Sequence, residues 1–206
     1  YPQIDGLSIT AGLITSTEVG GDYYDFFEST DKSNSIHVIC GDATGHGTAA
    51  GMMVSIIKSA LNGLPNLPVN EILERLNNIV KKINLGRLRM SLNVVKIDKN
   101  EIQISAAAMP PTYLFKAKSN TCEEIMIEGL PLGGLKNEKF KMLKKNFQKG
   151  DVLVMLSDGL PEASNEKQEM YDYDRIKELI SKNHTKEPKE IKKQLFDSLN
   201  LWINGG

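Results

Sequence analysis

The chain lacks most features that would place it outside the ordinary globular class. Only two of its 206 residues are cysteine, Cys40 and Cys122, which is too few for a disulfide framework and indicates a reducing compartment. No apolar run approaches the ~20 residues that cross a bilayer. A formal net charge of -1 leaves no overall field that would draw the chain to nucleic acid or to a membrane. We therefore expect a cytoplasmic domain with no nucleic-acid partner and no membrane insertion of its own, although a longer protein that carries it could be membrane-anchored.

A nucleotide-binding P-loop is also absent. The glycine-rich stretch "GDATGHGTAAG" (41–51) has no Gly-Lys-Ser/Thr pairing, so it does not predict a nucleoside triphosphate cradle. In this stretch an apolar run ends on Asp42 and is followed by glycines, a histidine and a threonine. Because glycine allows close approach of backbone or ligand, the stretch predicts a site that both backbone and carboxylate can reach.

The order of the expected elements indicates an α+β fold. Patterns of period two predict strands and patterns of period 3.6 predict helices. The strands are expected at 7–14, 20–28, 35–42, 89–98, 101–109, 112–118, 123–129, 140–147 and 151–158. The helices are expected at 47–62, 70–83 with Asn70 as its N-cap, 173–183 and 188–203. Strands, two helices, many strands and two helices favour two antiparallel sheets covered by helices.

Three aspartates share one local setting. Asp22 in "VGGDYYD", Asp42 in "VICGDATGHG" and Asp158 in "LVMLSDGLPE" all adjoin a glycine, and the last two end apolar strands. Converging carboxylates repel one another unless a cation lies between them, and Mg²⁺ and Mn²⁺ prefer oxygen ligands. Aspartate beside glycine is also the commonest turn chemistry, so each aspartate alone is better explained as a turn residue, and only the set of three favours a metal site as strongly. The pattern leaves both interpretations open.

Five segments, in their order and spacing, resemble the metal-dependent (PPM, or type 2C) serine/threonine protein phosphatases. They are "EVGGDYYDFF", "GDATGHGTAAGM", "SAAAMPPTYLF", "EGLPLGG" and "KGDVLVMLSDGLPEASN". Within that family they are most similar to the bacterial branch of the stage II sporulation protein E phosphatase domain. The resemblance implies a β-sandwich of two antiparallel sheets flanked by helix pairs (αββα), with a two-metal centre at one edge. It also implies one phosphatase domain over residues 1–206, expected to be excised from a longer multidomain signalling protein and to lack its last strand.

The same resemblance assigns roles to individual residues. Asp22 and Asp42 would bind two ions, Mn²⁺ or Mg²⁺, with Asp158 completing one side and Ala43 adding its main-chain carbonyl. These residues would act in catalysis through the bound metals, which activate the attacking water. His46 is a candidate proton donor, but it follows Asp42 by four residues, whereas relatives have a histidine right after their Asp-Gly pair. A role for His46 in fixing the loop is the open alternative.

Other residues are expected to have no direct part in the chemistry. Asp25 is expected to be structural or to support the metal ligands without binding a metal itself, and Ser157 and Cys40 have no convincing base partner in the sequence. His37 is expected on a strand surface, and Asp197 on a helix is a poor substitute for a further metal ligand.

The implied function is the hydrolysis of phosphoserine or phosphothreonine on a signalling protein, an anti-anti-sigma-type regulator. A homodimer would form through sensor or linker regions outside this chain. Two departures from the family pattern stand out. "ITSTEVGGD" has no arginine before Asp22, and the chain stops at Gly206, about where relatives begin a strand with an Asp-Asp pair. The open alternatives are a catalytically impaired module that binds a partner and transmits a signal, and an enzyme that hydrolyses a small phosphoester.

Overall fold

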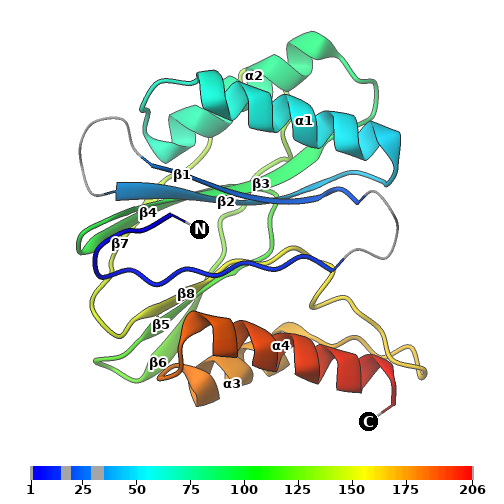
Figure 1. Ribbon diagram of the computed structural model, residues 1–206. Helices are drawn as coiled ribbons and strands as arrows, with labels where there is room; N and C mark the ends of the chain where they lie inside the picture. Colours follow the sequence, from blue (N-terminus) through cyan, green and yellow to red (C-terminus); the bar gives the residue numbers. More distant parts are fainter. Residues whose placement is uncertain (1, 15–19, 29–34, 206) are drawn as a thin grey trace.

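The computed structural model describes residues 2–14, 20–28 and 35–205, and it has the expected αββα architecture. Two antiparallel sheets lie face to face between two helix pairs, with α1 and α2 on one side and α3 and α4 on the other (Figure 1). The helices are α1 (Thr48–Gly63), α2 (Val69–Ile83), α3 (Tyr173–Asn183) and α4 (Pro188–Ile203). None of the helices in these described ranges has the length and apolar character needed to cross a membrane.

All four predicted helices are confirmed, but the predicted start of α2 is wrong. Asn70 lies inside the helix, and Pro68 is the N-cap with an extended backbone (φ -54°, ψ 144°). Proline has no backbone N–H to lose and its φ is already restricted, so it suits the residue at which a helix begins. The tertiary fold therefore starts α2 earlier than a side-chain capping signal suggests.

The larger sheet has the strand order β1-β2-β3-β4-β7 and the smaller sheet the order β6-β5-β8. Their bounds are β1 (Asp22–Glu28), β2 (Ser35–Ala43), β3 (Met90–Asp98), β4 (Glu101–Ala107), β5 (Thr112–Lys116), β6 (Thr121–Ile125), β7 (Leu143–Asn146) and β8 (Val152–Val154). All strand pairs are antiparallel. Several strands are shorter than predicted, most of all β8, because the residues after Val154 leave the sheet toward the loop that carries Asp158.

The prediction of a strand at 7–14 is wrong. Within the described ranges, the β-pairing of this segment is limited to an isolated bridge between Ile4 and Leu7. It lies instead along α4, where Lys192 Nζ donates to the Ala11 carbonyl (2.7 Å). Leu7 and Ile9 pack against the core between the sheets. The alternation of apolar residues therefore indicates that one side of an extended segment is buried, and the segment belongs to neither of the two sheets.

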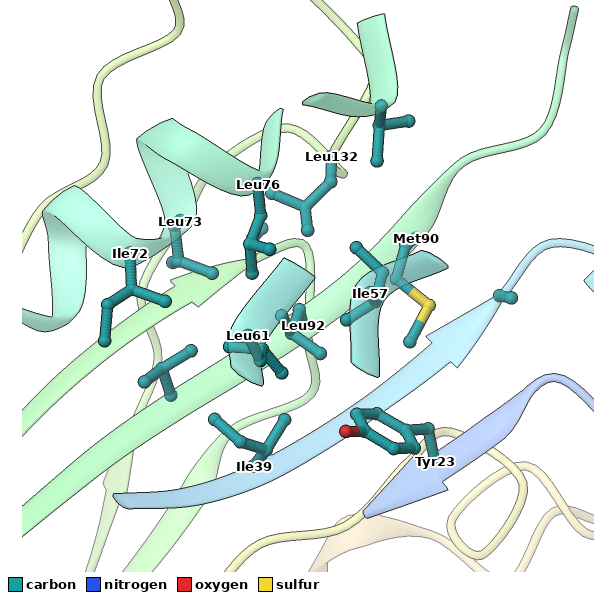
Figure 2. Packing of buried hydrophobic residues seen from close by; sticks show 14 of the residues in the cluster. Tyr23, Ile39, Ile57, Leu61, Ile72, Leu73, Leu76, Met90, Leu92 and Leu132 are labelled. Atoms are coloured by element: carbon teal, nitrogen blue, oxygen red, sulfur yellow. The ribbon is translucent and has the colours of Figure 1, made fainter. Parts of the chain in front are cut away.

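The core has three layers, and two of them cover the two faces of the larger sheet. Figure 2 shows the layer beneath the first helix pair, where Ile39 and Leu92 from the strands pack with Leu61, Leu73 and Leu76 from α1 and α2. Between the two sheets lies a second layer, and a third lies under α3 and α4. The larger sheet is therefore covered on both faces, which decides where its polar residues can reach solvent.

His37 is buried because both faces of the larger sheet are covered, so the prediction that it lies on a strand surface is wrong. Its side chain is 1% exposed and stacks on Phe27, with ring centroids 4.5 Å apart. β2 is an inner strand of the larger sheet, so helices cover one of its faces and the second sheet covers the other. A histidine in the middle of such a strand is buried whichever way it points.

Asn77 is a buried amide that joins α2 to the "LPLGG" loop. It accepts a hydrogen bond from the Gly133 N–H (2.8 Å) and donates one to the Leu135 carbonyl (2.8 Å). The loop also pairs with the start of β3, because Met90 and Leu132 exchange two backbone hydrogen bonds. One side chain therefore holds the loop between a helix and the sheet.

We expect Asn77→Ala to lower the free energy of unfolding by about 2–3 kcal/mol, because it leaves the buried Gly133 N–H without a partner and removes the bond to the Leu135 carbonyl. Urea denaturation measures this loss. Asn62→Ala is the matched control, since the Asn62 amide donates to the Lys58 carbonyl at an exposed position; it should change stability by less than about 0.5 kcal/mol. Equal effects of the two substitutions would contradict this role of Asn77.

Candidate metal centre

Asp22 and Asp42 lie directly opposite each other across the β1–β2 ladder. Side chains alternate between the two faces of a strand. Val38 and Cys40 of β2 pack against the core between the sheets, and so does Phe26 of β1. Asp42 and Asp22 share this alternation, so both carboxylates project from the inter-sheet face at the end of the strand pair. Opposite positions in an antiparallel pair place Cβ atoms roughly 4.5–5.5 Å apart.

The third aspartate reaches the same place from the smaller sheet. Asp158 follows β8 and opens a turn, in which its carbonyl accepts a hydrogen bond from the Glu162 N–H (2.9 Å). Its side chain is exposed, whereas that of Asp42 is half-buried. Burial raises the pKa of Asp42 to about 6, and the negative charges of Asp22 and Asp158 add to the shift. The fold thus gathers the three carboxylates at one edge of the sandwich.

This arrangement suits a hard divalent cation. In the part of the chain that the structure describes, no lysine, arginine or histidine forms an ion pair with any of the three. The charges of Asp22 and Asp158 act on Asp42, but no three histidine, cysteine, aspartate or glutamate side chains of the described ranges are close enough to hold an ion by themselves, so the protein ligands would be fewer than three. Mg²⁺ keeps several waters and is commonly held by one or two carboxylates, so a facing pair with a third carboxylate nearby fits it.

Close backbone approach is required at Gly21. The Ala43 N–H donates to the Gly21 carbonyl (2.9 Å), and a Cβ on Gly21 would lie 2.2 Å from the Ala43 oxygen and 2.8 Å from Asp42 Oδ1. The glycines of the following loop have a different purpose. Gly45 and Gly47 have open space around them, but their φ values of 85° and 77° strain any other residue. Gly21 therefore allows the two strand ends to approach each other closely, whereas Gly45 and Gly47 allow the chain to turn after Ala43.

The remaining predicted residues are less closely tied to the three carboxylates. His46 is exposed in the loop before α1 and makes no hydrogen bond with a residue in the described ranges, so its role stays a prediction. Residues 15–19, in the stretch without arginine, lie outside the described residues.

Asp25 points to the helix-covered face and accepts hydrogen bonds from the Tyr23 hydroxyl (2.8 Å) and the Phe26 N–H (2.9 Å). Burial alone would raise the pKa of Asp25, but the two hydrogen bonds and the nearby Lys58 lower it overall, as suits a structural carboxylate.

Cys40 lies next to the carboxylates on the same face of β2. Burial raises the pKa of its thiol to about 12, and the charges of Asp22 and Asp42 contribute. The thiol therefore stays protonated at neutral pH and is a poor nucleophile, as the sequence suggested.

Two polar residues of β3 border this site and were missed by the sequence reasoning. Ser91 is the cross-strand neighbour of Asp42, and Asn93 that of Cys40. Asn93 donates to Thr112 Oγ1 (2.6 Å) in the other sheet, so both residues belong to the inter-sheet face. The signal was present in "RMSLNVVKID", where polar residues occupy two successive positions of one face of an otherwise apolar strand.

Comparisons with known proteins show one matching family and several structures with the same fold. The family described as stage II sporulation protein E matches residues 32–206. The phosphoserine phosphatase RsbU of Bacillus subtilis (strain 168) is 29% identical over 203 residues, an alignment that covers 96% of this chain but 59% of that relative. The chain thus spans less than two thirds of the length of this curated relative.

Solved structures share the fold. The SiaA-PP2C domain of Pseudomonas aeruginosa matches with a TM-score of 0.75 and 16% identity, over 90% of this chain and 75% of that chain. RsbX in complex with magnesium matches with a TM-score of 0.66 and 19% identity, over 91% of this chain and 82% of that chain. At these identities the two structures establish the architecture alone.

Proposed function

This chain belongs to the stage II sporulation protein E family, and from that premise we propose that it is a metal-dependent protein phosphatase acting on phosphoserine or phosphothreonine. The observation that carries the proposal is the meeting of Asp22 and Asp42 across the β1–β2 ladder with Asp158 from the other sheet. The similarity to a phosphoserine phosphatase supports the reaction, and the magnesium complex of RsbX supports Mg²⁺ or Mn²⁺ as the ion.

Each residue of the site would have a defined part. Asp22 and Asp42 would hold the ions, with Asp158 and the Ala43 carbonyl as further oxygen donors. Two divalent cations bound there would lower the pKa of a water and neutralise the phosphoryl oxygens during attack. The β1–β2 ladder fixes the spacing of two carboxylates, and the smaller sheet brings the third. No serine or cysteine nucleophile is needed, which suits the protonated thiol of Cys40.

The substrate that we propose is a small phosphorylated signalling protein of the anti-anti-sigma type. The family resemblance of the sequence motifs supports this choice. Without an arginine directly before Asp22, the carboxylate-bound ions would be the main contacts of the phosphate. Affinity would then depend on protein surfaces around the phosphorylated residue.

Phosphate release from a phosphoserine protein tests the proposal. We expect release with Mn²⁺ or Mg²⁺, background levels after EDTA, and recovery when the metal is added back. Release that persists in EDTA, or no release from either a phosphoprotein or p-nitrophenyl phosphate with Mn²⁺, would rule the proposal out. Comparing phosphoprotein with nucleotide substrates separates a protein phosphatase from an enzyme for small phosphoesters.

One observation favours a second candidate function, a phosphatase fold that binds a partner without efficient catalysis. Among the described residues, no three acidic, histidine or cysteine side chains lie close enough to one another to hold an ion. For such a module we expect saturable binding of the phosphoprotein, measured by calorimetry, with no phosphate release at any Mn²⁺ concentration. Turnover with Mn²⁺ would exclude it.

A further inference from the structure

Asn93 is a polar side chain buried where the two sheets meet. It is 3% exposed, and its Nδ2 donates to Thr112 Oγ1 (2.6 Å), which joins β3 of the larger sheet to β5 of the smaller one. Its Oδ1 is also buried, and no donor from the described residues reaches it. One end of this amide is therefore satisfied by the fold and the other is not.

The neighbours of Asn93 explain why its own sheet cannot satisfy the oxygen. Its cross-strand partners are Cys40 and Ala106. A thiol is only a weak donor, and an alanine side chain has no donor. The next residue on the same face is Ser91, which lies opposite Asp42. Asn93 thus occupies the row immediately beneath the row that contains Asp42 and Asp22.

An amide oxygen buried without a hydrogen bond costs roughly 1–3 kcal/mol, so such atoms are normally paired. A buried water commonly supplies the bond when it finds two to four polar partners. The Asn93 amide, the Ser91 hydroxyl and the Asp42 carboxylate offer three within neighbouring positions of two paired strands. Diagonal positions in a sheet are roughly 7–8 Å apart along the backbone, and side chains that reach toward each other across the diagonal leave a shorter gap that one water can bridge.

We propose that a buried water links the Asn93 amide oxygen to the Asp42 carboxylate, so that Asn93 is a positioning residue of the metal centre. The water donates one proton to Asn93 Oδ1 and the other to Asp42, and it accepts from the Ser91 hydroxyl. Through this water the Asn93 oxygen orients the carboxylate, whereas the hydrogen bond to Thr112 ties the two sheets together. This inference rests on the proposed function, because it assumes that Asp42 is a metal ligand.

The paired substitution Asn93→Leu/Thr112→Val separates this role from a structural one. It replaces both partners of the inter-sheet hydrogen bond by apolar groups of similar size, a change that can be nearly neutral for stability. We expect the Tm without metal to stay within about 3 °C of wild type, and the Kd for Mn²⁺, measured by calorimetry, to rise about tenfold, as for other residues that support metal ligands.

Thr112→Val alone is the control, because it removes the inter-sheet bond and keeps the Asn93 oxygen. We expect it to lower the Tm without changing the Kd for Mn²⁺. Asn93→Ala also removes Oδ1 and provides a second test with the same expected direction, should the paired variant not fold. An unchanged Kd in a folded variant without Oδ1 would overturn the inference, and so would an equal rise in Thr112→Val.

Asp42→Asn completes the calorimetry series and keeps the two proposals apart. If wild type binds Mn²⁺, Asp42→Asn binds it weakly and removal of the Asn93 oxygen has no effect, only the positioning role fails. If Asp42→Asn binds Mn²⁺ as wild type does, the proposed metal centre itself is wrong, and the role of Asn93 falls with it.

Discussion

Asp42→Asn is expected to reduce metal-dependent phosphate release by at least about 100-fold. An amide has no negative charge to hold a divalent cation, and bound metals contribute several kcal/mol to such reactions, at 1.36 kcal/mol for each factor of ten. Initial rates with a phosphoserine protein, over a range of Mn²⁺ concentrations, measure the loss. Asp197→Asn is the matched control, because Asp197 is exposed on α4 and paired with Lys193. It should retain wild-type activity.

The same substitution should stabilise the metal-free protein. Since burial and the other two aspartates raise the pKa of Asp42 to about 6, its ionised form opposes folding at neutral pH. The native state therefore binds more protons than the unfolded state between the ordinary pKa of 3.8 and about 6, and stability falls as pH rises through this range. Asparagine removes that cost, so the Tm at pH 7 should rise while activity falls. A fall in both would indicate that Asp42 is a structural residue.

Gly21→Ala is expected to damage the site and the fold together. The added Cβ would lie 2.2 Å from the Ala43 oxygen, which is backbone and cannot move aside as a flexible side chain would. The β1–β2 ladder must open at its end, where Asp22 faces Asp42. We expect a loss of about 2 kcal/mol or more in the free energy of unfolding, or about 5 °C in Tm, together with most of the activity.

Gly63→Ala is the control for this prediction. Gly63 ends α1, and a Cβ added to it would have no atom within 4 Å, so alanine there should be neutral or slightly stabilising. Thermal unfolding and Mn²⁺-dependent phosphate release are measured on both variants. Wild-type stability and activity in Gly21→Ala would show that the strand end adjusts without cost, and that the close contact does not define the site.

The helices show how far local pattern can lead. α4 spans the predicted 188–203, and its buried side chains Ile191, Leu195 and Leu199 recur at the spacing of one helical face. Strands were predicted less well, because alternation reports burial of one face and not pairing. Residues 7–14 have that alternation, yet the segment lies along α4 and belongs to neither of the two sheets.

The site divides in a similar way. The sequence alone determined that Asp22, Asp42 and Asp158 are the candidates, since each stands beside a glycine in a stretch that resembles one family of phosphatases. Only the tertiary structure decided that Asp22 faces Asp42 and that Asp158 arrives from the other sheet, because strand register depends on contacts between distant segments. It also decided that Asn93 lies between the sheets with an unsatisfied oxygen, since burial of a polar atom depends on what covers it, and here the cover is a strand nearly twenty residues further along the chain.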